Sequence, residues 1–512
     1  MPKLFSGLVA VWFTCVAVAA PKPAQPPRVP GADRVQSTTL ANGMKVIVWT
    51  DTDIPNIALY NWVRVGSRNE VPGITGLAHF FEHMMFNGTS RRSPGEFDRL
   101  MEAQGGRNNA FTNENVTVYQ DWFPSSALEL VLDLESDRLA NLSFDPQVIE
   151  SERGVVYSER RLAVEDSNEG FLVEQVQATA FVAHPYQIPT IGWPADIQGW
   201  KLEDLQKFFK THYAPNNCTL IMVGNVTAEQ GFALAKRYLE PIPRQEPPPP
   251  IRTTEPAQLG EKRVLVERTA LTPVLIQAYK SPAANDPLGP AINLLMSVLT
   301  DGNSSRLHRL LVEEKKLAIQ VTAQFQEGFD PMLTWVQLTL PEGADIDAVE
   351  QALDAALDDV VARGVTDAEL ARAKNQFAAE FWKQIATIDG KASLLGQFEV
   401  FEGDYRRLFD APAAYERVTR EDLQKAAGLV FQRKHRTVGV LRSPVAETES
   451  EPAAAPAGES ADSTVGGSSA ALGAPAAMAV PAVAAIPAAI PATIPAGESA
   501  ALPAIATPGT TP

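Results

Sequence analysis

Residues 79–83 read His-Phe-Phe-Glu-His, and this stretch constrains the chain more than any other. In a helix, His79 and His83 lie one turn apart on the same face, with Glu82 beside them. Two imidazoles at that spacing can bind one Zn²⁺, and a neighbouring carboxylate can accept a proton from water at the metal. A helix that carries two histidines by coincidence is disfavoured, because the 512-residue chain has only six histidines. The stretch therefore predicts a zinc site built on one helix.

A third zinc ligand is expected elsewhere, because catalytic zinc sites usually have three protein ligands and one open position. Segment 147–165 predicts a helix rich in carboxylates. Its Glu152 and Glu159 are two helical turns apart and share one face, whereas Glu150 points elsewhere. The spacing does not decide between Glu152 and Glu159. A solvated acidic face that pairs with neighbouring arginines is an open alternative for any single one of these glutamates.

The charge balance excludes one class of partner. The formal net charge is −17, and no run of five or more basic residues occurs. The chain therefore lacks the basic surface with which proteins bind nucleic acid. Its 45 % hydrophobic and 21 % charged residues are typical of a folded globular protein, so a sizeable core is expected.

The first 19 residues predict a secretory signal peptide. Lys3 gives a short positive start, an apolar stretch follows, and Ala17-Val18-Ala19 fits the small-residue cleavage rule. The prediction is export to the periplasm or the extracellular space, with no membrane span after cleavage. An uncleaved anchor is the alternative, disfavoured because the apolar run is short for a span. The mature chain would keep only Cys218, so it can form no internal disulfide.

The rest of the chain predicts an α+β fold, in which helices pack on mixed sheets without a regular βαβ order. Asn42-Gly43 predicts a hairpin near the start of the fold at Val35, and a helix is expected to begin with Ser93 as its N-cap. The expected organisation begins with a signal peptide (1–19) and a proline-rich leader (20–34). A zinc-bearing domain (35–239), a proline-rich linker (240–261) and a second domain (262–445) follow. The chain is expected to end in a disordered low-complexity tail (446–512).

The two domains are predicted to be a distant duplication. The pentapeptide Glu-Asp-Leu-Gln-Lys occurs at 203–207 and again at 421–425, each time on a late helix before an apolar strand. Superimposing the early helices places Asn293, Met296 and Ser297 where the first domain has its zinc-site residues. The second domain is therefore expected to bind no metal.

Over residues 35–443 the chain resembles the pitrilysin-type M16 metallopeptidases, whose zinc signature is the inverted order His-x-x-Glu-His. The motifs that carry the resemblance are Gly76–Met84 with Phe86 and Gly88, Gly105-Gly106, Asn109–Thr112, and Glu152–Glu159. The resemblance implies two homologous halves, each an α/β sandwich of the LuxS/metallohydrolase-like kind.

The resemblance also implies a zinc endopeptidase that hydrolyses peptides or small unfolded polypeptides with one Zn²⁺ per chain. It assigns Glu159 as the third ligand and Glu152 as a supporting residue of the active site. Glu82 would take a proton from water and pass it to the leaving amine. The strand that contains Asn109, Ala110 and Phe111 would pair with the extended peptide substrate through main-chain hydrogen bonds. An ordinary internal strand is the alternative for that segment.

One departure from the family pattern lies in the second half. Active members carry an Arg and a Tyr seven residues apart, which steady the oxyanion of the transition state. The matching positions here are Val312 and Ile319. We therefore expect a homologous partner subunit to supply the Arg/Tyr pair, or a homodimer with a differently built site. A non-catalytic scaffold or binding protein on the same fold is a further alternative.

Overall fold

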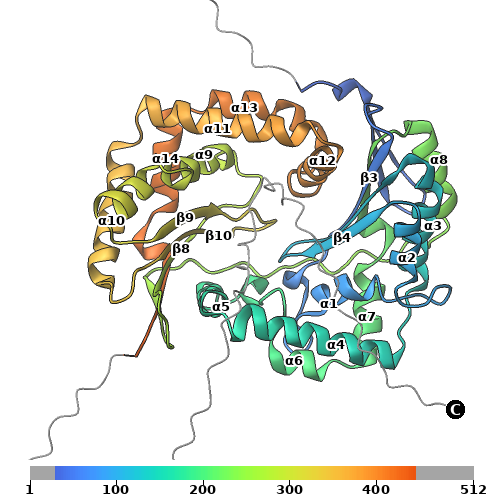
Figure 1. Ribbon diagram of the computed structural model, residues 1–512, viewed down its shortest axis with the longest axis horizontal. Coiled ribbons are helices and arrows are strands. Elements are labelled where there is room, and N and C mark those ends of the chain that lie inside the picture. The colour runs from blue at the N-terminus through green and yellow to red at the C-terminus, as the bar shows by residue number, and fades with distance from the viewer. Residues whose placement is uncertain (1–28, 445–512) are drawn as a thin grey trace, which may run out of the picture.

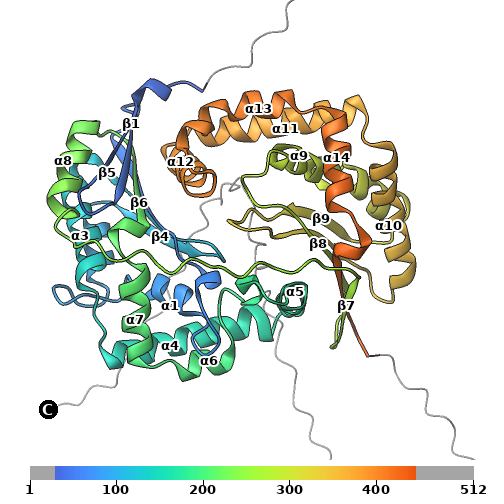
Figure 2. The same ribbon diagram turned by 180° about the vertical axis from the view of Figure 1, so that it is seen from behind.

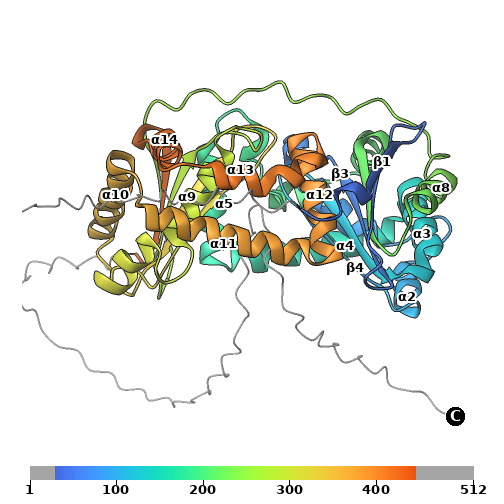
Figure 3. The ribbon, with the colours of Figure 1, turned by 90° about the horizontal axis from the view of Figure 1, so that it is seen from above.

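The computed structural model describes residues 29–444 as two lobes, each built on one β-sheet (Figure 1). The predicted signal peptide 1–19, the leader up to residue 28 and the predicted tail 446–512 lie outside the described residues. In Figure 3 the segment that follows α8 (Ala228–Tyr238) crosses from one lobe to the other. Within the described part, every helix is too short or too polar to span a bilayer.

The first sheet has six strands in the order β1-β2-β6-β3-β5-β4. Its strands are β1 (Val35–Thr39), β2 (Lys45–Thr50), β3 (Asn56–Val63), β4 (Arg107–Thr112), β5 (Thr117–Pro124) and β6 (Cys218–Gly224). Strands β2 and β6 run parallel, and the other neighbours are antiparallel. The predicted hairpin is confirmed between β1 and β2, where Gly43 has the positive φ (93°) that favours glycine.

The second sheet repeats this arrangement with five strands in the order β7-β11-β8-β10-β9. Its strands are β7 (Lys262–Glu267), β8 (Val274–Lys280), β9 (Gln320–Phe325), β10 (Leu333–Thr339) and β11 (Arg436–Arg442). Strands β7 and β11 run parallel, and the other neighbours are antiparallel. Apart from β1, each strand of the first sheet has a counterpart with the same place and direction. The predicted α+β fold of two homologous halves is confirmed.

Helices cover the sheets in a matching order in the two halves. The other helices of the first half are α1 (Leu77–Met84), α2 (Glu96–Ala103), α3 (Leu128–Asn141), α4 (Pro146–Arg160), α5 (Asn168–Ala180), α6 (Pro194–Gly199) and α7 (Leu202–His212). Those of the second half are α9 (Gly289–Thr300), α10 (Ile346–Arg363), α11 (Asp367–Ile385), α12 (Ile388–Glu402), α13 (Ala411–Arg417) and α14 (Arg420–Val430). The repeated pentapeptide lies on α7 and α14, and each of these helices precedes its closing strand, β6 or β11.

The predicted start of helix α2 is wrong by a few residues. The helix begins at Glu96 after Gly95, whose positive φ (70°) interrupts the helical backbone. Ser93 is not the N-cap. Its main-chain N–H and its hydroxyl both donate to the carboxylate of Glu96, at 3.0 Å each, and hold a turn before the helix.

The two halves exchange a helix. Helix α5 of the first half packs on β7, β8 and β11 of the second sheet, and α12 of the second half packs on β3 and β6 of the first sheet (Figures 1 and 2). Two of the four apolar cores therefore contain side chains from both halves. Trp49 lies in one core with Leu395, and Leu172 lies in another with Ile276. Burial of apolar surface in these shared cores holds the halves together.

The exchanged helices begin alike. Ser167 and Thr387 cap α5 and α12 by accepting hydrogen bonds from the main-chain N–H groups of Gly170 and Gly390. Each glycine packs so closely on the preceding helix that a Cβ would collide with a main-chain carbonyl oxygen. A larger residue at either position would push the helix away from its sheet.

The exchanged helices also make equivalent polar contacts. Gln177 of α5 donates to Glu114 at 3.0 Å, and Gln397 of α12 donates to Glu327 at 2.9 Å. Each glutamate follows an edge strand, β4 or β9. Each glutamine stands ten residues after the cap of its helix. A repeated pattern of Ser/Thr, Gly and Gln thus marks the duplication alongside the pentapeptide.

Candidate metal centre

Helix α1 is fixed in orientation by its apolar face. Phe80, Phe81 and Met84 are fully buried in the first core. The remaining face carries His79, which is buried, and His83, which is half-buried, and it lies against α4. Packing of the apolar residues therefore directs both imidazoles toward the carboxylates of α4.

The start of α1 is held by a buried carboxylate. Glu70 accepts hydrogen bonds from the main-chain N–H groups of Gly76 and Ala78, at 2.7 Å each. Gly76 has a positive φ (88°), and a Cβ there would lie 2.6 Å from the carbonyl oxygen of Ile191. These contacts satisfy the free N–H groups at the helix N-terminus and fix where the first turn begins.

His79, His83 and Glu159 form a compact set of donor atoms. The two imidazole Nε2 atoms are 3.3 Å apart, and Glu159 Oε2 lies 3.6 Å from His79 Nε2 and 3.5 Å from His83 Nε2. A tetrahedral zinc ion with bonds of about 2.0–2.1 Å places its ligand atoms about 3.3–3.4 Å from one another. The three side chains therefore fit zinc in both ligand type and spacing. The side chain of Glu159 is 46 % exposed, which leaves the site open to solvent.

The protonation of the trio suits a cation. Burial lowers the pKa of His79 to about 4, so this imidazole is neutral at pH 7 and offers a lone pair. Burial also disfavours a charged His83, but its contacts with Glu152 and Glu159 outweigh burial and raise its pKa to about 10. The hydrogen bond from His83 in turn lowers the pKa of Glu159. The proton on His83 thus balances the carboxylates, and a divalent cation would displace it.

Glu152 occupies a different place from Glu159. One of its carboxylate oxygens lies 2.7 Å from Nδ1 of His83, on the side of the ring opposite the trio. Such a contact selects the tautomer of a metal-binding histidine and orients its ring. The other oxygen accepts a hydrogen bond from Asn87 Nδ2 at 2.9 Å. The structure therefore brings Glu159 to the Nε2 atoms and places Glu152 behind His83.

Glu82 lies beside the trio and outside it. The side chain is half-buried, and Thr112 at the end of β4 is among the neighbours that lower the pKa of its carboxylate. Burial raises the pKa of Glu82 above its ordinary value. A carboxylate with a raised pKa is a stronger base than an exposed one, as a proton acceptor near neutral pH requires.

The segment Asn109–Phe111 lies on β4, an edge strand of the first sheet. Helix α1 packs against both β4 and β5, and β5 is the one strand that pairs with β4. Phe111 is 37 % exposed and makes an edge-to-face contact with Trp62, with ring centroids 6.2 Å apart. The strand thus presents an open main-chain edge next to the helix that carries the histidines.

The second half has a counterpart of this site with different residues. Gly88 and Gly302, both with positive φ, follow α1 and α9 and fix the alignment of the two helices. Asn293 and Ser297 of α9 then stand at the positions of the two histidines. The hydroxyl of Ser297 donates to Gln376 Oε1 on α11 at 3.1 Å. Gln376 lies on α11, which follows α10 as α4 follows α3, so the partner of Ser297 comes from the helix that corresponds to α4.

The positions expected for an Arg/Tyr pair carry no side-chain hydrogen-bond donor. Val312 packs against the core of the second half, and Ile319 is 54 % exposed just before β9. The nearby Arg306 binds Glu369 through two hydrogen bonds of 2.8 and 2.6 Å. That guanidinium is therefore already engaged within the second half.

Three residues of the site region escaped sequence reasoning. Glu70 lies in a segment that predicts only a turn, Asn87 follows the motif helix without a motif of its own, and Gln376 lies on a long amphipathic helix. The signal for Gln376 was available, because aligning the halves by their repeats brings it close to Glu159. The contacts of Glu70 and Asn87 depend on packing between segments and leave no mark in the spacing.

Comparisons with known proteins cover most of the described chain. A family profile described as insulinase (peptidase family M16) matches residues 46–193, and one described as peptidase M16 inactive domain matches residues 199–377. The zinc protease PqqE of Helicobacter pylori is 29 % identical over 413 residues, which is 80 % of this chain and 92 % of that protein. An uncharacterized zinc protease of Mycobacterium leprae is 28 % identical over 400 residues, covering 78 % of this chain and 89 % of its own.

Solved structures show the same architecture. The crystal structure of a protease from Helicobacter pylori matches with a TM-score of 0.77 at 29 % identity, covering 80 % of this chain and 99 % of that one. A peptidase M16 inactive domain from Pseudomonas fluorescens matches with a TM-score of 0.75 at 18 % identity, covering 80 % and 98 %. At that lower identity the likeness establishes the fold alone.

Proposed function

Because the chain belongs to the M16 family of zinc proteases, we propose that it is a zinc-dependent endopeptidase that hydrolyses peptides or small unfolded polypeptides. The observation that carries this proposal is the triangle of donor atoms from His79, His83 and Glu159. Its edges of 3.3–3.6 Å suit one tetrahedral zinc ion per chain. The relatives that are named zinc proteases support the same assignment.

The proposed mechanism assigns the proton transfers to Glu82. A bound zinc ion would supply Lewis-acid polarisation of the scissile carbonyl and would make water more acidic. Glu82 accepts the proton of the attacking water at its carboxylate and then donates that proton to the nitrogen of the leaving amine. Glu152 keeps the Nε2 atom of His83 directed at the ligand set.

The proposed substrate-binding element is the open edge of β4. An extended peptide can add to this edge through main-chain hydrogen bonds, and Asn109, Ala110 and Phe111 would then lie beside it. Recognition of this kind reads main-chain shape more than sequence. It favours unfolded segments over folded domains, because only an extended chain can pair along an edge strand.

We propose that this chain is the metal-bearing subunit of a two-chain enzyme. Val312 and Ile319 offer no donor for the oxyanion of the transition state, so a homologous partner subunit would supply an Arg and a Tyr. A homodimer is the second arrangement to test. The predicted signal peptide supports action in the periplasm or outside the cell.

The test is an assay of purified full-length protein for zinc content and for cleavage of an unstructured peptide. Zinc-dependent cleavage that is lost in Glu82→Gln, with zinc content unchanged, supports the proposal. Cleavage that appears only after a homologous Arg/Tyr-bearing chain is added supports the two-chain form. A zinc-free protein that cannot be loaded with zinc would contradict the enzymatic proposal and leave a scaffold role.

A further inference from the structure

Asn87 lies directly behind the zinc-binding residues, in the turn that follows α1. Its side-chain amide Nδ2 donates to Glu152 Oε2 at 2.9 Å and to the main-chain carbonyl oxygen of His83 at 3.2 Å. Its own main-chain N–H donates to the carbonyl of Met84 at 2.9 Å, which fixes the position of the residue relative to the helix. One amide group therefore touches both the end of the metal helix and the carboxylate that orients His83.

These contacts close a ring around His83. Glu152 Oε1 lies 2.7 Å from the imidazole Nδ1, and Glu152 Oε2 is held by Asn87, which in turn holds the main chain of His83. The terminal torsion of a glutamate side chain is broad when nothing restrains it. A donor on the second oxygen restrains that torsion and keeps the first oxygen in line with Nδ1. One oxygen of Glu152 thus orients the His83 ring, and the other is held by Asn87.

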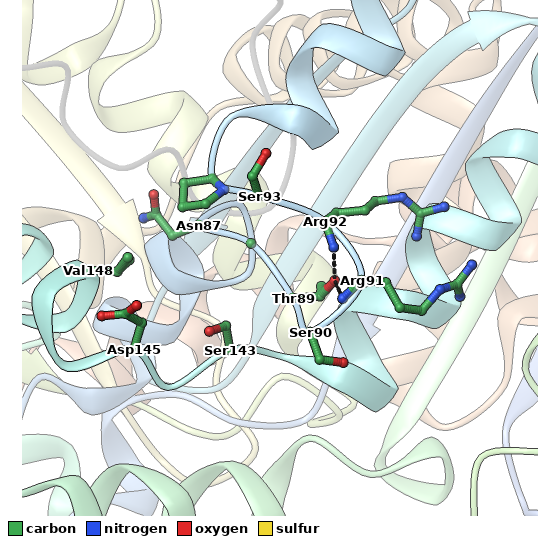
Figure 4. Close-up of a pocket in the computed structure, with 11 residues that line it drawn as sticks. Asn87, Thr89, Ser90, Arg91, Arg92, Ser93, Ser143, Asp145 and Val148 are labelled. Carbon is green, nitrogen blue, oxygen red and sulfur yellow. Dashed lines mark hydrogen bonds between the residues drawn. The ribbon is translucent and has the colours of Figure 1, made fainter.

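The arginines of the neighbouring loop bind a carboxylate other than Glu152. A cavity of about 320 Å³ adjoins the residue and is lined by the loop 88–94 and the start of α4 (Figure 4). The side chains of Arg91 and Arg92 point away from Asn87 in this view, and both form ion pairs with Asp133 on α3. The two nearest arginines of the loop are therefore engaged with another carboxylate.

From this geometry we infer that Asn87 is a positioning residue of the zinc site, which acts through Glu152 to hold His83 in the orientation that binds the metal. The inference rests on the proposed function, because it presumes that His79, His83 and Glu159 bind zinc. A purely structural cap on α1 would instead affect folding and leave the affinity of the folded protein for zinc unchanged.

The experiment measures the zinc dissociation constant of the full-length protein by competition with a chromophoric chelator. Asn87→Leu keeps the approximate volume and removes the donor, and Asn87→Ala removes both. Asn141→Leu is the matched control, because Asn141, the last residue of α3, likewise donates to a carboxylate, that of Asp137 at 2.8 Å. Urea unfolding of the zinc-free forms shows in parallel whether each variant folds.

We expect Asn87→Leu and Asn87→Ala to bind zinc several-fold and up to about 10-fold more weakly, because Asn87 acts through Glu152 and loss of a ligand's direct partner typically costs about 10–100-fold. Asn141→Leu should change the affinity less than about 2-fold. Equal zinc affinity in wild type and Asn87→Leu would overturn the inference and leave the proposed function intact. Failure of the wild type to bind zinc would instead overturn the proposed function. Unfolding of both zinc-free Asn87 variants would assign the residue to the fold and reject the positioning role.

Discussion

The same position in the two halves carries two kinds of site. In the first half, His79, His83 and Glu159 bring three potential ligand atoms together, with 3.3–3.6 Å between them. In the second half, the hydroxyl of Ser297 donates directly to Gln376, so these neutral groups satisfy each other. A set of acceptors needs a cation or a proton, whereas a donor–acceptor pair needs neither. The same fold holds both sets, and the difference between them lies in the side chains.

A hydrogen bond between a glutamate and a glutamine, away from the candidate metal centre, occurs in both halves. Glu114 and Glu327 each follow an edge strand and accept a hydrogen bond from a glutamine of the exchanged helix. Glu327 also accepts a hydrogen bond at 3.2 Å from Asn293, the counterpart of His79. The contact between each half and its own exchanged helix therefore occurs in both copies, while among the described residues the cluster of two histidines and a glutamate occurs in one.

The largest expected effect comes from giving the first site the carboxamide of the second. Glu159→Gln should weaken zinc binding by at least about 100-fold, because loss of a direct ligand should exceed the loss of an outer partner, and peptide cleavage should fall with it. The converse change, Gln376→Glu, should bind no second zinc, because α9 carries Asn293 and Ser297 where α1 carries two histidines. Chelator competition checks both variants. Unchanged affinity in Glu159→Gln would remove that residue from the ligand set.

The exchanged helices predict that the two halves depend on each other for stability. Leu395→Ala on α12 removes a fully buried side chain from a core shared by both halves and should cost about 2–5 kcal/mol. Leu429→Ala on α14, where the side chain is 39 % exposed, is the control and should cost less than about 1 kcal/mol. Because the core is shared, urea should unfold both halves in one transition. Two separate transitions in the wild type would contradict this account.

A smaller effect should follow from pH. Burial raises the pKa of Glu327 to about 7 from its ordinary 4.5. The folded protein thus keeps a proton that the unfolded chain releases, so the stability penalty is absent below about pH 4.5, grows as pH rises and is complete above about pH 7. Glu327→Gln removes this cost of ionising a buried carboxyl group. Its free energy of unfolding should therefore rise relative to that of the wild type as pH increases, by at most about 3 kcal/mol, and by less where solvent reaches the side chain.

Urea unfolding of zinc-free wild type and Glu327→Gln at pH 5 and pH 8 checks this expectation. Zinc-free protein is used so that metal binding does not contribute to the measured stability. Glu114→Gln is the partner variant, because burial raises the pKa of Glu114 as well. A stability difference between Glu327→Gln and wild type that is the same at both pH values would contradict the assignment of the raised pKa.

The features that could be predicted from the sequence are those encoded by short stretches of neighbouring residues. The spacing of His79 and His83 predicted their helix face, and Asn42-Gly43 predicted the first hairpin. The repeated pentapeptide predicted that the chain is a duplication. In each case the relevant contact lies within one helix or one turn, so periodicity and turn chemistry are sufficient.

The contacts that could not be predicted from the sequence are those between segments that are distant in the chain. The apolar faces of α5 and α12 indicate burial, but periodicity does not say against which sheet a helix packs. Glu70 caps α1 from a turn six residues before Gly76, and Asn87 reaches a carboxylate on α4. Spacing also left Glu152 and Glu159 undecided, because both lie on one face of α4. Only the placement of α4 against α1 separates the two.

The central claim, that one half binds zinc and the other does not, is tested most directly by counting zinc. The triple variant His79→Asn, His83→Ser and Glu159→Gln gives the first site the residues of the second. Elemental analysis of full-length protein after zinc loading and desalting should find one zinc per chain in the wild type and none in the triple variant, with both proteins folded. A wild type without zinc, or a folded triple variant that keeps it, would contradict the account.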